Sequence, residues 1–406
     1  MAKPVKKKVG LLAQARASVT KALKTDDWHV TLDPEELLEP FPNLPTGSIV
    51  IDYLIGGKPN RHGVSPCPGL PKGRMSQVWG HESAGKTTLA LTAAATTCQN
   101  GGTVLYVDWE NDIVPDYAAS LGVPITDPDK FELAQPDTLE QGIQIALTYA
   151  EHGVDLIVFD SIGSAALQRL VNRSLEDVGG QSKVGELQQI WSQELTTLKA
   201  TIKSTGTHIM GISQVRAKIS TMRTNGPTTQ PQGGNAWKFF SSIRMELRRV
   251  SNESSKQHNA LTHKTEDRVT GGVIKAKMVK CKMSDSQGRE EIFYIRWGEG
   301  IDDYRSIMEI AIGHGIIKKG GAWLTWNPPQ GEEVKEQGKE RLRKFLKKNP
   351  EKFQMLYKQV IPFLTPKVEE DHEGEDEWEE PEELVEDDVI DDLISEAASG
   401  NEGTAE

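Results

Sequence analysis

The stretch MSQVWGHESAGKTTLALTAAA, residues 75–95, decides the fold of this chain. An apolar, strand-like run leads into a helical run, and the loop between them fits the pattern G-x-x-x-x-G-K-[ST]. Glycines in such a loop let backbone N–H groups turn inward around phosphate oxygens, and the N-terminus of the following helix adds its positive end. A chance match in a glycine-rich loop would lack this flanking strand and helix. We therefore expect a nucleotide to bind here, through Gly80, His81, Glu82, Ser83, Ala84, Gly85, Lys86, Thr87 and Thr88.

The chemistry of phosphate groups gives individual side chains distinct roles. Lys86 is expected to reach the β- and γ-phosphates, and the Thr87 hydroxyl to coordinate Mg²⁺. The apolar run LIVF, residues 156–159, ends in Asp160. This Walker-B pattern would hold the same Mg²⁺ through a water molecule. We expect ATP as the nucleotide and Mg²⁺ as its metal ion.

Glu110 ends another apolar run, VLYVDWE, residues 104–110. A carboxylate at the C-terminal edge of a strand faces the crevice where ligands bind in open α/β sheets. It can orient and deprotonate the water that attacks a phosphate. The alternative is a surface acid beside Asp108, and the residues alone leave both interpretations open.

Alternating strand-like and helical runs predict the fold class. An additional strand-like run, SIVIDYLIGG, occupies residues 48–57. The alternation predicts an α/β fold with a twisted, mostly parallel sheet and helices on both faces. The predicted strands are MSQVWG (75–80), TVLYVDWE (103–110), DLIVFDS (155–161), HIMGISQ (208–214), SIRMELRRV (242–250) and VIKAKMVKCKM (273–283), and the predicted helices are 86–98, 138–151 and 184–203.

Changes in composition divide the chain into four parts. Residues 1–45 form a basic helical segment and linker, 46–300 the α/β core, 301–365 a small mixed unit, and 366–406 an acidic tail that we expect to be disordered. The N-terminal segment has an apolar stripe that needs a surface to cover it, and we expect a second protomer to supply that surface. The stripe consists of Leu12, Ala15, Val19 and Leu23.

The formal net charge of -12 hides a strong asymmetry. Of the 59 acidic residues, 19 lie in 369–406, which has no Lys or Arg, so the body has 40 acidic residues against 47 basic ones, a net charge of +7. A basic body suits a polyanionic ligand, and an acidic tail can compete with that ligand or simply aid solubility. Valine and leucine spacing in the tail also permits a short helix that docks a partner protein.

Several classes of protein are disfavoured. No apolar run is long enough to span a membrane, and the basic N-terminus lacks the apolar stretch of a signal peptide. Cys67, Cys98 and Cys281 are too few and too scattered for a disulfide framework or a zinc cluster. We expect reduced thiols in a cytoplasmic protein.

Taken together, the motifs resemble those of the RecA family of bacterial-type DNA recombinases. The resemblance runs from about Thr46 to Pro350, and the order of its motifs is far more specific than any one of them. It implies a RecA-like P-loop ATPase core that forms helical filaments on single-stranded DNA and exchanges strands with double-stranded DNA. The matching segments are GHESAGKTTLAL, VDWE, PDYAASLGV, QPDTLEQ, VDLIVFDS, VGELQQIWSQELTTL, ISQVRAKI, GGNAWKFFSSIRMELRR, KMVKCKM and YIRWGEGI.

The resemblance also implies roles by position. Glu110 corresponds to the family's catalytic glutamate, and Gln214 to the glutamine that senses the γ-phosphate and begins the second DNA-binding loop. Lys280 and Lys282 correspond to lysines that reach the ATP of the neighbouring subunit, and Tyr117 to a residue that stacks on the base. Without the family, a solvated strand edge would be the better interpretation of the two lysines.

Two polar, glycine-bearing segments would be the DNA-binding loops, at about 174–185 and 215–234. Their basic residues can bind phosphates, while apolar residues at two family positions, Val184 and Ile219, would wedge between bases. Ordinary solvent-exposed connections are the alternative. The expected DNA contacts are Lys183, Val184, Arg216, Lys218, Ile219, Arg223, Gly233, Gly234 and Asn235.

Several positions depart from the family pattern. Val114 stands where an aspartate usually contacts adenine, which puts adenine selectivity in doubt, and Gln189 and Thr196 replace two arginines that usually help grip DNA. We interpret the chain as a divergent member, of the kind that a bacterium or a phage-infected bacterial cell would contain.

Other functions have to be weighed against strand exchange. The closest alternative is a RecA-like repair ATPase or motor that binds DNA without exchanging strands. A small-molecule phosphotransferase would need an acceptor pocket and an arginine-rich lid, neither of which the sequence indicates. A non-catalytic DNA scaffold would not need Lys86 or Glu110.

Overall fold

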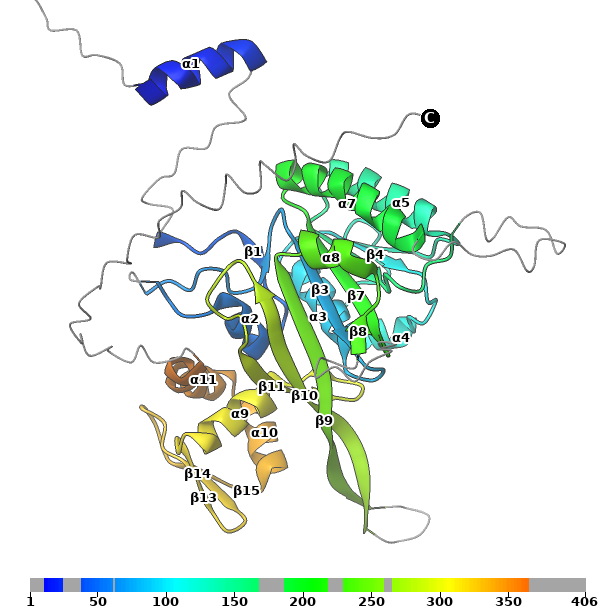
Figure 1. Ribbon diagram of the computed structural model, residues 1–406. Helices are drawn as coiled ribbons and strands as arrows, with labels where there is room; N and C mark the ends of the chain where they lie inside the picture. Colours follow the sequence, from blue (N-terminus) through cyan, green and yellow to red (C-terminus); the bar gives the residue numbers. More distant parts are fainter. Residues whose placement is uncertain are drawn as a thin grey trace, which may run out of the picture. The chain divides into compact units, whose positions relative to one another are not determined.

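The computed structural model describes residues 11–24, 38–60, 63–167, 186–217, 229–258 and 265–364 (Figure 1). The expected N-terminal helix is present as α1, Leu11–Leu23. Leu12 in its stripe is 81% exposed. The expected disorder of 366–406 falls outside the described residues. In the part of the chain that is described, no helix is long and apolar enough to cross a membrane.

A large sheet forms the centre of the molecule (Figure 1). Its strands are β3 (Met75–Gly80), β4 (Val104–Asp108), β5 (Phe131–Ala134), β6 (Leu156–Asp160), β7 (His208–Ala217), β8 (Thr229–Pro231), β9 (Ile243–His258), β10 (Thr265–Cys281), β11 (Glu290–Arg296) and β12 (Gly300–Ile301). The order is β12-β11-β10-β9-β3-β7-β6-β4-β5, and β8 pairs with β7. Neighbours from β9 to β5 are parallel, whereas β10, β11 and β12 add an antiparallel edge. The predicted α/β class with a mostly parallel sheet is confirmed.

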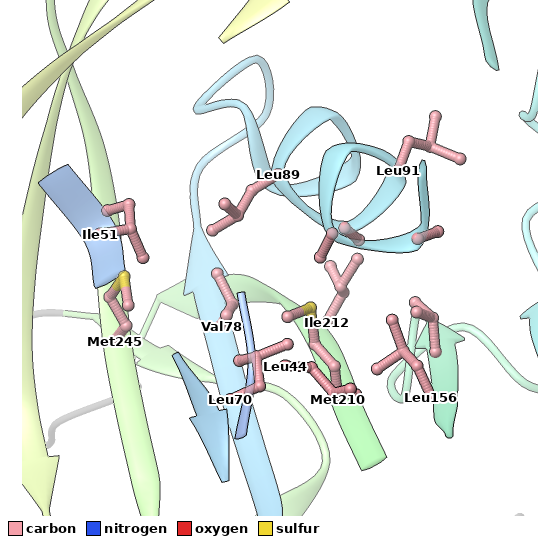
Figure 2. Close-up of a cluster of buried hydrophobic side chains, with 14 of the residues drawn as sticks. Leu44, Ile51, Leu70, Val78, Leu89, Leu91, Leu156, Met210, Ile212 and Met245 are labelled. Atoms are coloured by element: carbon pink, nitrogen blue, oxygen red, sulfur yellow. The ribbon is translucent and has the colours of Figure 1, made fainter. Parts of the chain in front are cut away.

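Helices cover both faces of this sheet. They are α3 (Lys86–Gln99), α4 (Pro115–Ser120), α5 (Leu139–Glu151), α7 (Glu186–Thr205) and α8 (Gly234–Phe240). Successive side chains of β6 point to opposite faces. Val158 therefore belongs to the apolar cluster on the α3 face, while Phe159 belongs to the cluster with residues of α5 and α7. Figure 2 shows part of the first cluster, where Leu89 of α3 lies near Val78 of β3 and Ile212 of β7.

The predicted strand at 48–57 is wrong, because this segment forms the helix α2, Ile49–Gly56. Ser48 caps the helix by accepting a hydrogen bond from the Ile51 amide, and Asp52 accepts one from the Thr46 amide at 2.8 Å. The helix packs against β11 on one side and the C-terminal unit on the other, so it is apolar almost all around. An unbroken apolar run of this length fits a buried helix as well as a buried strand.

Two further small sheets flank the core. The first pairs β1 (Asn43–Leu44) with β2 (Leu70–Pro71). The second belongs to a C-terminal unit with its own apolar cluster. That unit contains α9 (Asp303–Gly313), β13 (Ile317–Gly320), β14 (Trp323–Trp326), β15 (Val334–Gln337), α10 (Lys339–Lys348) and α11 (Pro350–Leu364). The predicted small C-terminal domain is therefore confirmed.

Ion pairs join the C-terminal unit to the core. Arg343 on α10 is 4% exposed and forms ion pairs with Asp302, beside β12, and with Glu299 at 2.7 Å. Arg296 of β11 reaches Glu340 of α10 at 2.9 Å. Of these pairs only Arg343–Asp302 is fully buried, and leaving either of its charges unpaired would be costly.

Candidate active site

The phosphate loop connects β3 to α3 in the shape that its sequence predicts. Gly85, the N-cap of α3, has a φ of 84°, in the left-handed region that glycine adopts most easily. A side chain at Gly80 would meet the Leu247 carbonyl oxygen of β9 at 2.2 Å. The loop therefore needs glycine at Gly85 for its backbone conformation and at Gly80 for close packing.

Lys86 lies inside this loop and is 9% exposed. Its ammonium group donates to the His81 carbonyl at 2.9 Å. Burial lowers the pKa of Lys86, while the negative charges of Asp160, Glu110 and Glu82 oppose that shift. A lysine ammonium group at the start of α3 suits the negatively charged triphosphate of a nucleotide.

Thr87 and Asp160 meet where the strands end. The Thr87 hydroxyl donates to Asp160 Oδ2 at 2.9 Å, and the Tyr106 hydroxyl donates to the same oxygen at 2.8 Å. Burial raises the pKa of Asp160 to about 6, against the lowering effect of these two hydrogen bonds. Mg²⁺ commonly takes one or two protein oxygens and completes its shell with water and phosphate. The oxygen donors of Thr87 and Asp160 fit that requirement.

Glu110 lies beside this pair, at the carboxyl ends of three parallel strands. Gln214 of β7 donates its amide to Glu110 Oε1 at 3.1 Å and to Oε2 at 3.3 Å. Ser161 and Ser164, which follow β6, place their hydroxyls 2.5 and 2.6 Å from Oε1. The structure thus brings Glu110 and Gln214, two expected site residues, into contact and adds two serines. Ser161 stood out in the sequence only as the residue after Asp160, and no sequence signal pointed to Ser164.

Asp108 holds the loop that carries Glu110. It is 1% exposed, and its Oδ1 accepts hydrogen bonds from the amides of Glu110 and Asn111 at 3.1 and 2.9 Å. Its Oδ2 accepts from the Ile113 amide at 3.3 Å and from the Gln135 side chain at 3.2 Å. Sequence reasoning treated Asp108 only as a neighbour of Glu110, although an aspartate inside a buried strand is itself unusual.

Tyr117 lies on α4, and Val114 is the N-cap residue of that helix. The Tyr117 hydroxyl is 2.8 Å from the hydroxyl of Thr88, so the two expected nucleotide-binding residues contact each other. Val114 is 58% exposed and has no polar side-chain atom to offer a nucleotide base.

Lys280 and Lys282 are placed at the end of β10, beside α8. The ammonium group of Lys280 donates to the carbonyls of Lys238 and Phe239 at 2.8 and 3.3 Å. Burial lowers the pKa of Lys280, and the nearby charges of Lys282, Arg244 and Lys238 lower it further. Among the described residues, neither lysine forms an ion pair with a carboxylate. Lys282 follows one residue after the strand ends, and a register shift precedes Lys280, so the regular alternation expected of the pair is interrupted.

The structure describes only some of the expected DNA contacts. Gly233 caps α8 with a φ of 94°, and Gly234 and Asn235 begin that helix. Arg216 lies in β7, and its side chain is outside the described residues. The whole of five other expected contact residues also lies outside the described residues: Lys183, Val184, Lys218, Ile219 and Arg223.

Comparison with known proteins identifies two matching domain families. Residues 36–302 match the RecA N-terminal domain, and residues 305–365 match the RecA C-terminal domain. The chain is 36% identical to Protein RecA of Frankia alni, over 82% of this chain and 87% of that protein. It is 36% identical to Protein RecA of Amycolatopsis mediterranei, over 78% of this chain and 82% of that protein. A solved structure of the RadB recombinase is 22% identical, with a TM-score of 0.43, over 64% of this chain and 98% of that one.

Proposed function

The chain belongs to the RecA family of recombinases, and we propose that it forms filaments on single-stranded DNA in which DNA binding stimulates ATP hydrolysis and strand exchange follows. Membership of this family does not favour the alternative of a repair motor without strand exchange. The observation that carries the proposed hydrolysis is the meeting of Glu110, Gln214 and the Thr87–Asp160 pair at one edge of the sheet.

Each side chain has a defined task in this proposal. Lys86 neutralises charge on the β- and γ-phosphates, and Glu110 orients the attacking water and accepts its proton. Thr87 and Asp160 would hold Mg²⁺, which would supply further charge neutralisation at the phosphates. Gln214 contacts Glu110 and lies on β7, which runs into the second DNA loop, so its position can respond to both nucleotide and DNA.

The remaining charge comes from a neighbouring protomer. Lys280 and Lys282 lie beside α8, and the Lys280 ammonium group donates hydrogen bonds to backbone carbonyls of that helix in the same chain. We propose that in a filament they face the next protomer's ATP, so that hydrolysis requires assembly. Helix α1, with its exposed apolar stripe, provides a second contact between protomers.

Other parts of the chain complete the proposal. Residues 46–300 act as the ATPase core with the DNA-binding loops, and 301–365 as a separate C-terminal domain. The acidic tail 366–406 competes with DNA and can dock regulatory or single-strand-binding proteins. All three cysteines are free and buried, which suits the reducing cytoplasm of a bacterial or phage-infected cell.

ATP hydrolysis with and without single-stranded DNA tests the proposal. Glu110→Gln should retain ATP but cleave it at a rate lower by about 10²–10⁴, the usual contribution of a general base. Glu151→Gln, an exposed glutamate at the end of α5, is the matched control and should behave as the unchanged chain. Near-normal turnover in Glu110→Gln would assign the base to another residue. Absence of DNA stimulation in the unchanged chain would contradict the proposed function.

A further inference from the structure

We propose that Ser164 is a positioning residue for Glu110, an inference that rests on the proposed ATPase function. Three donors converge on one oxygen of that carboxylate. The Ser161 hydroxyl is 2.5 Å, the Ser164 hydroxyl 2.6 Å and the Gln214 amide 3.1 Å from Glu110 Oε1. The two serine hydroxyls are 2.7 Å apart. Each hydroxyl has one proton, so when both donate to Oε1 neither donates to the other, and their mutual contact can only replace one of those two bonds.

The two carboxylate oxygens of Glu110 are therefore unequal. Among the described residues, Oε2 receives only the longer contact from Gln214, at 3.3 Å. Hydrogen bonds to Oε1 hold the plane of the carboxylate and leave the lone pairs of Oε2 available. A base contributes to catalysis only when its free oxygen is within hydrogen-bond reach of the water. Ser164 and Ser161 thus select Oε2 of Glu110 as the oxygen that faces the attacking water.

Ser164 is the better probe of this arrangement. Ser161 is 1% exposed and directly follows Asp160, so a change there would also disturb the Mg²⁺ site. Backbone bonds hold the turn that carries Ser164, since its own amide donates to the Ser161 carbonyl at 3.1 Å and the Ile162 amide to the Ile212 carbonyl at 2.9 Å. Alanine at 164 would keep this turn and remove only the hydroxyl.

Steady-state ATP hydrolysis by the full chain on single-stranded DNA tests the inference. Ser164→Ala should lower kcat about tenfold, the lower end expected for losing a hydrogen bond to a charged group, and should leave KM for ATP within about twofold. Ser164→Thr, which restores a hydroxyl, should recover most of the lost kcat. Ser204→Ala is the matched control, because Ser204 is an exposed serine that bonds within α7. It should leave both constants unchanged.

A double variant separates positioning from a general structural effect. If Ser164 acts through Glu110, Ser164→Ala should cause no further loss in a Glu110→Gln background. An equal tenfold loss in that background would overturn the inference. So would an unchanged or increased kcat in Ser164→Ala. If Ser164→Ala also lowers the melting temperature, Ser164→Thr becomes the deciding variant. A Ser164→Thr chain of normal stability whose kcat is as low as that of Ser164→Ala would overturn the inference.

The failure of the proposed function would look different. In that case the unchanged chain would not hydrolyse ATP, or Glu110→Gln would remain active. If the unchanged chain is active, Glu110→Gln is inactive and Ser164→Ala is normal, the ATPase proposal stands and the positioning role is wrong.

Discussion

Replacing Asp108 with alanine should uncouple the catalytic loop from the sheet. The carboxylate is 1% exposed and accepts four hydrogen bonds, three of them from the backbone of the loop that contains Glu110. A hydrogen bond to a charged group contributes about 1.5–3 kcal/mol, but neighbouring bonds do not add fully and water can replace some of them. We expect Asp108→Ala to lower the free energy of unfolding by about 3 kcal/mol.

The effect on hydrolysis should be similar in size to the effect on folding. A displacement of about 1 Å in a catalytic group can reduce the rate about 10²-fold, so kcat should fall by that order. Asp108→Asn retains an oxygen for the amides of Glu110 and Asn111 but presents an NH₂ group to the Ile113 amide. It should cost only about 1–2 kcal/mol and reduce kcat less than alanine does.

Urea unfolding and steady-state hydrolysis on single-stranded DNA would measure both quantities. Asp129→Ala, an exposed aspartate before β5, is the control and should leave both unchanged. The expected order of kcat is the unchanged chain, then Asp108→Asn, then Asp108→Ala. A normal kcat in Asp108→Ala would refute the idea that this carboxylate holds Glu110 in place.

Three further predictions concern stability and DNA binding. Burial lowers the pKa of His208 to about 4 in the folded chain, so the unfolded chain binds the proton more tightly. The free energy of unfolding should therefore fall by up to about 1.4 kcal/mol per pH unit as the pH drops from 6.5 towards 4. His208→Gln should weaken that pH dependence in urea unfolding, and an identical slope would exclude His208 as its source. Arg343→Ala leaves Asp302 buried without its partner and should lower the free energy of unfolding by about 3–5 kcal/mol. The additional change Asp302→Ala should recover part of that loss. Full additivity of the two changes in the double variant would count against a coupled pair. Deleting 369–406 removes 19 negative charges and should tighten binding to single-stranded DNA, most clearly at low salt. A fluorescence titration at low salt would measure the affinity. An unchanged affinity would leave the tail with only a role in solubility.

The sequence signals for the proposed nucleotide site are local. The residues from Gly80 to Thr87 are continuous, and the strand and helix that hold them adjoin them directly. Asp160 and Glu110 each end an apolar strand, so a parallel sheet must bring them to the same edge. For these residues, the pattern along the chain already contains the geometry.

Other features depend on contacts that the sequence does not display. Helix α2 looks like a strand because it is buried on several sides, and only its Ser48 cap distinguishes it. The paired strands β9, Ile243–His258, and β10, Thr265–Cys281, are both much longer than the runs predicted for them. Ser164 approaches Glu110 across 54 positions of sequence, and no periodicity or motif records such a contact.

A mixing experiment tests the central claim, that hydrolysis needs residues from two protomers. A Lys280→Ala, Lys282→Ala variant keeps its own phosphate loop and should bind nucleotide without hydrolysing it, while Lys86→Ala keeps the two lysines and lacks a working loop. Each variant alone should be inactive on single-stranded DNA. In mixed filaments, the normal lysines of one protomer should meet the normal loop of another, and ATP hydrolysis should partly return. If demonstrated mixed filaments remain inactive, Lys280 and Lys282 do not act on the neighbour's ATP, and the account is contradicted.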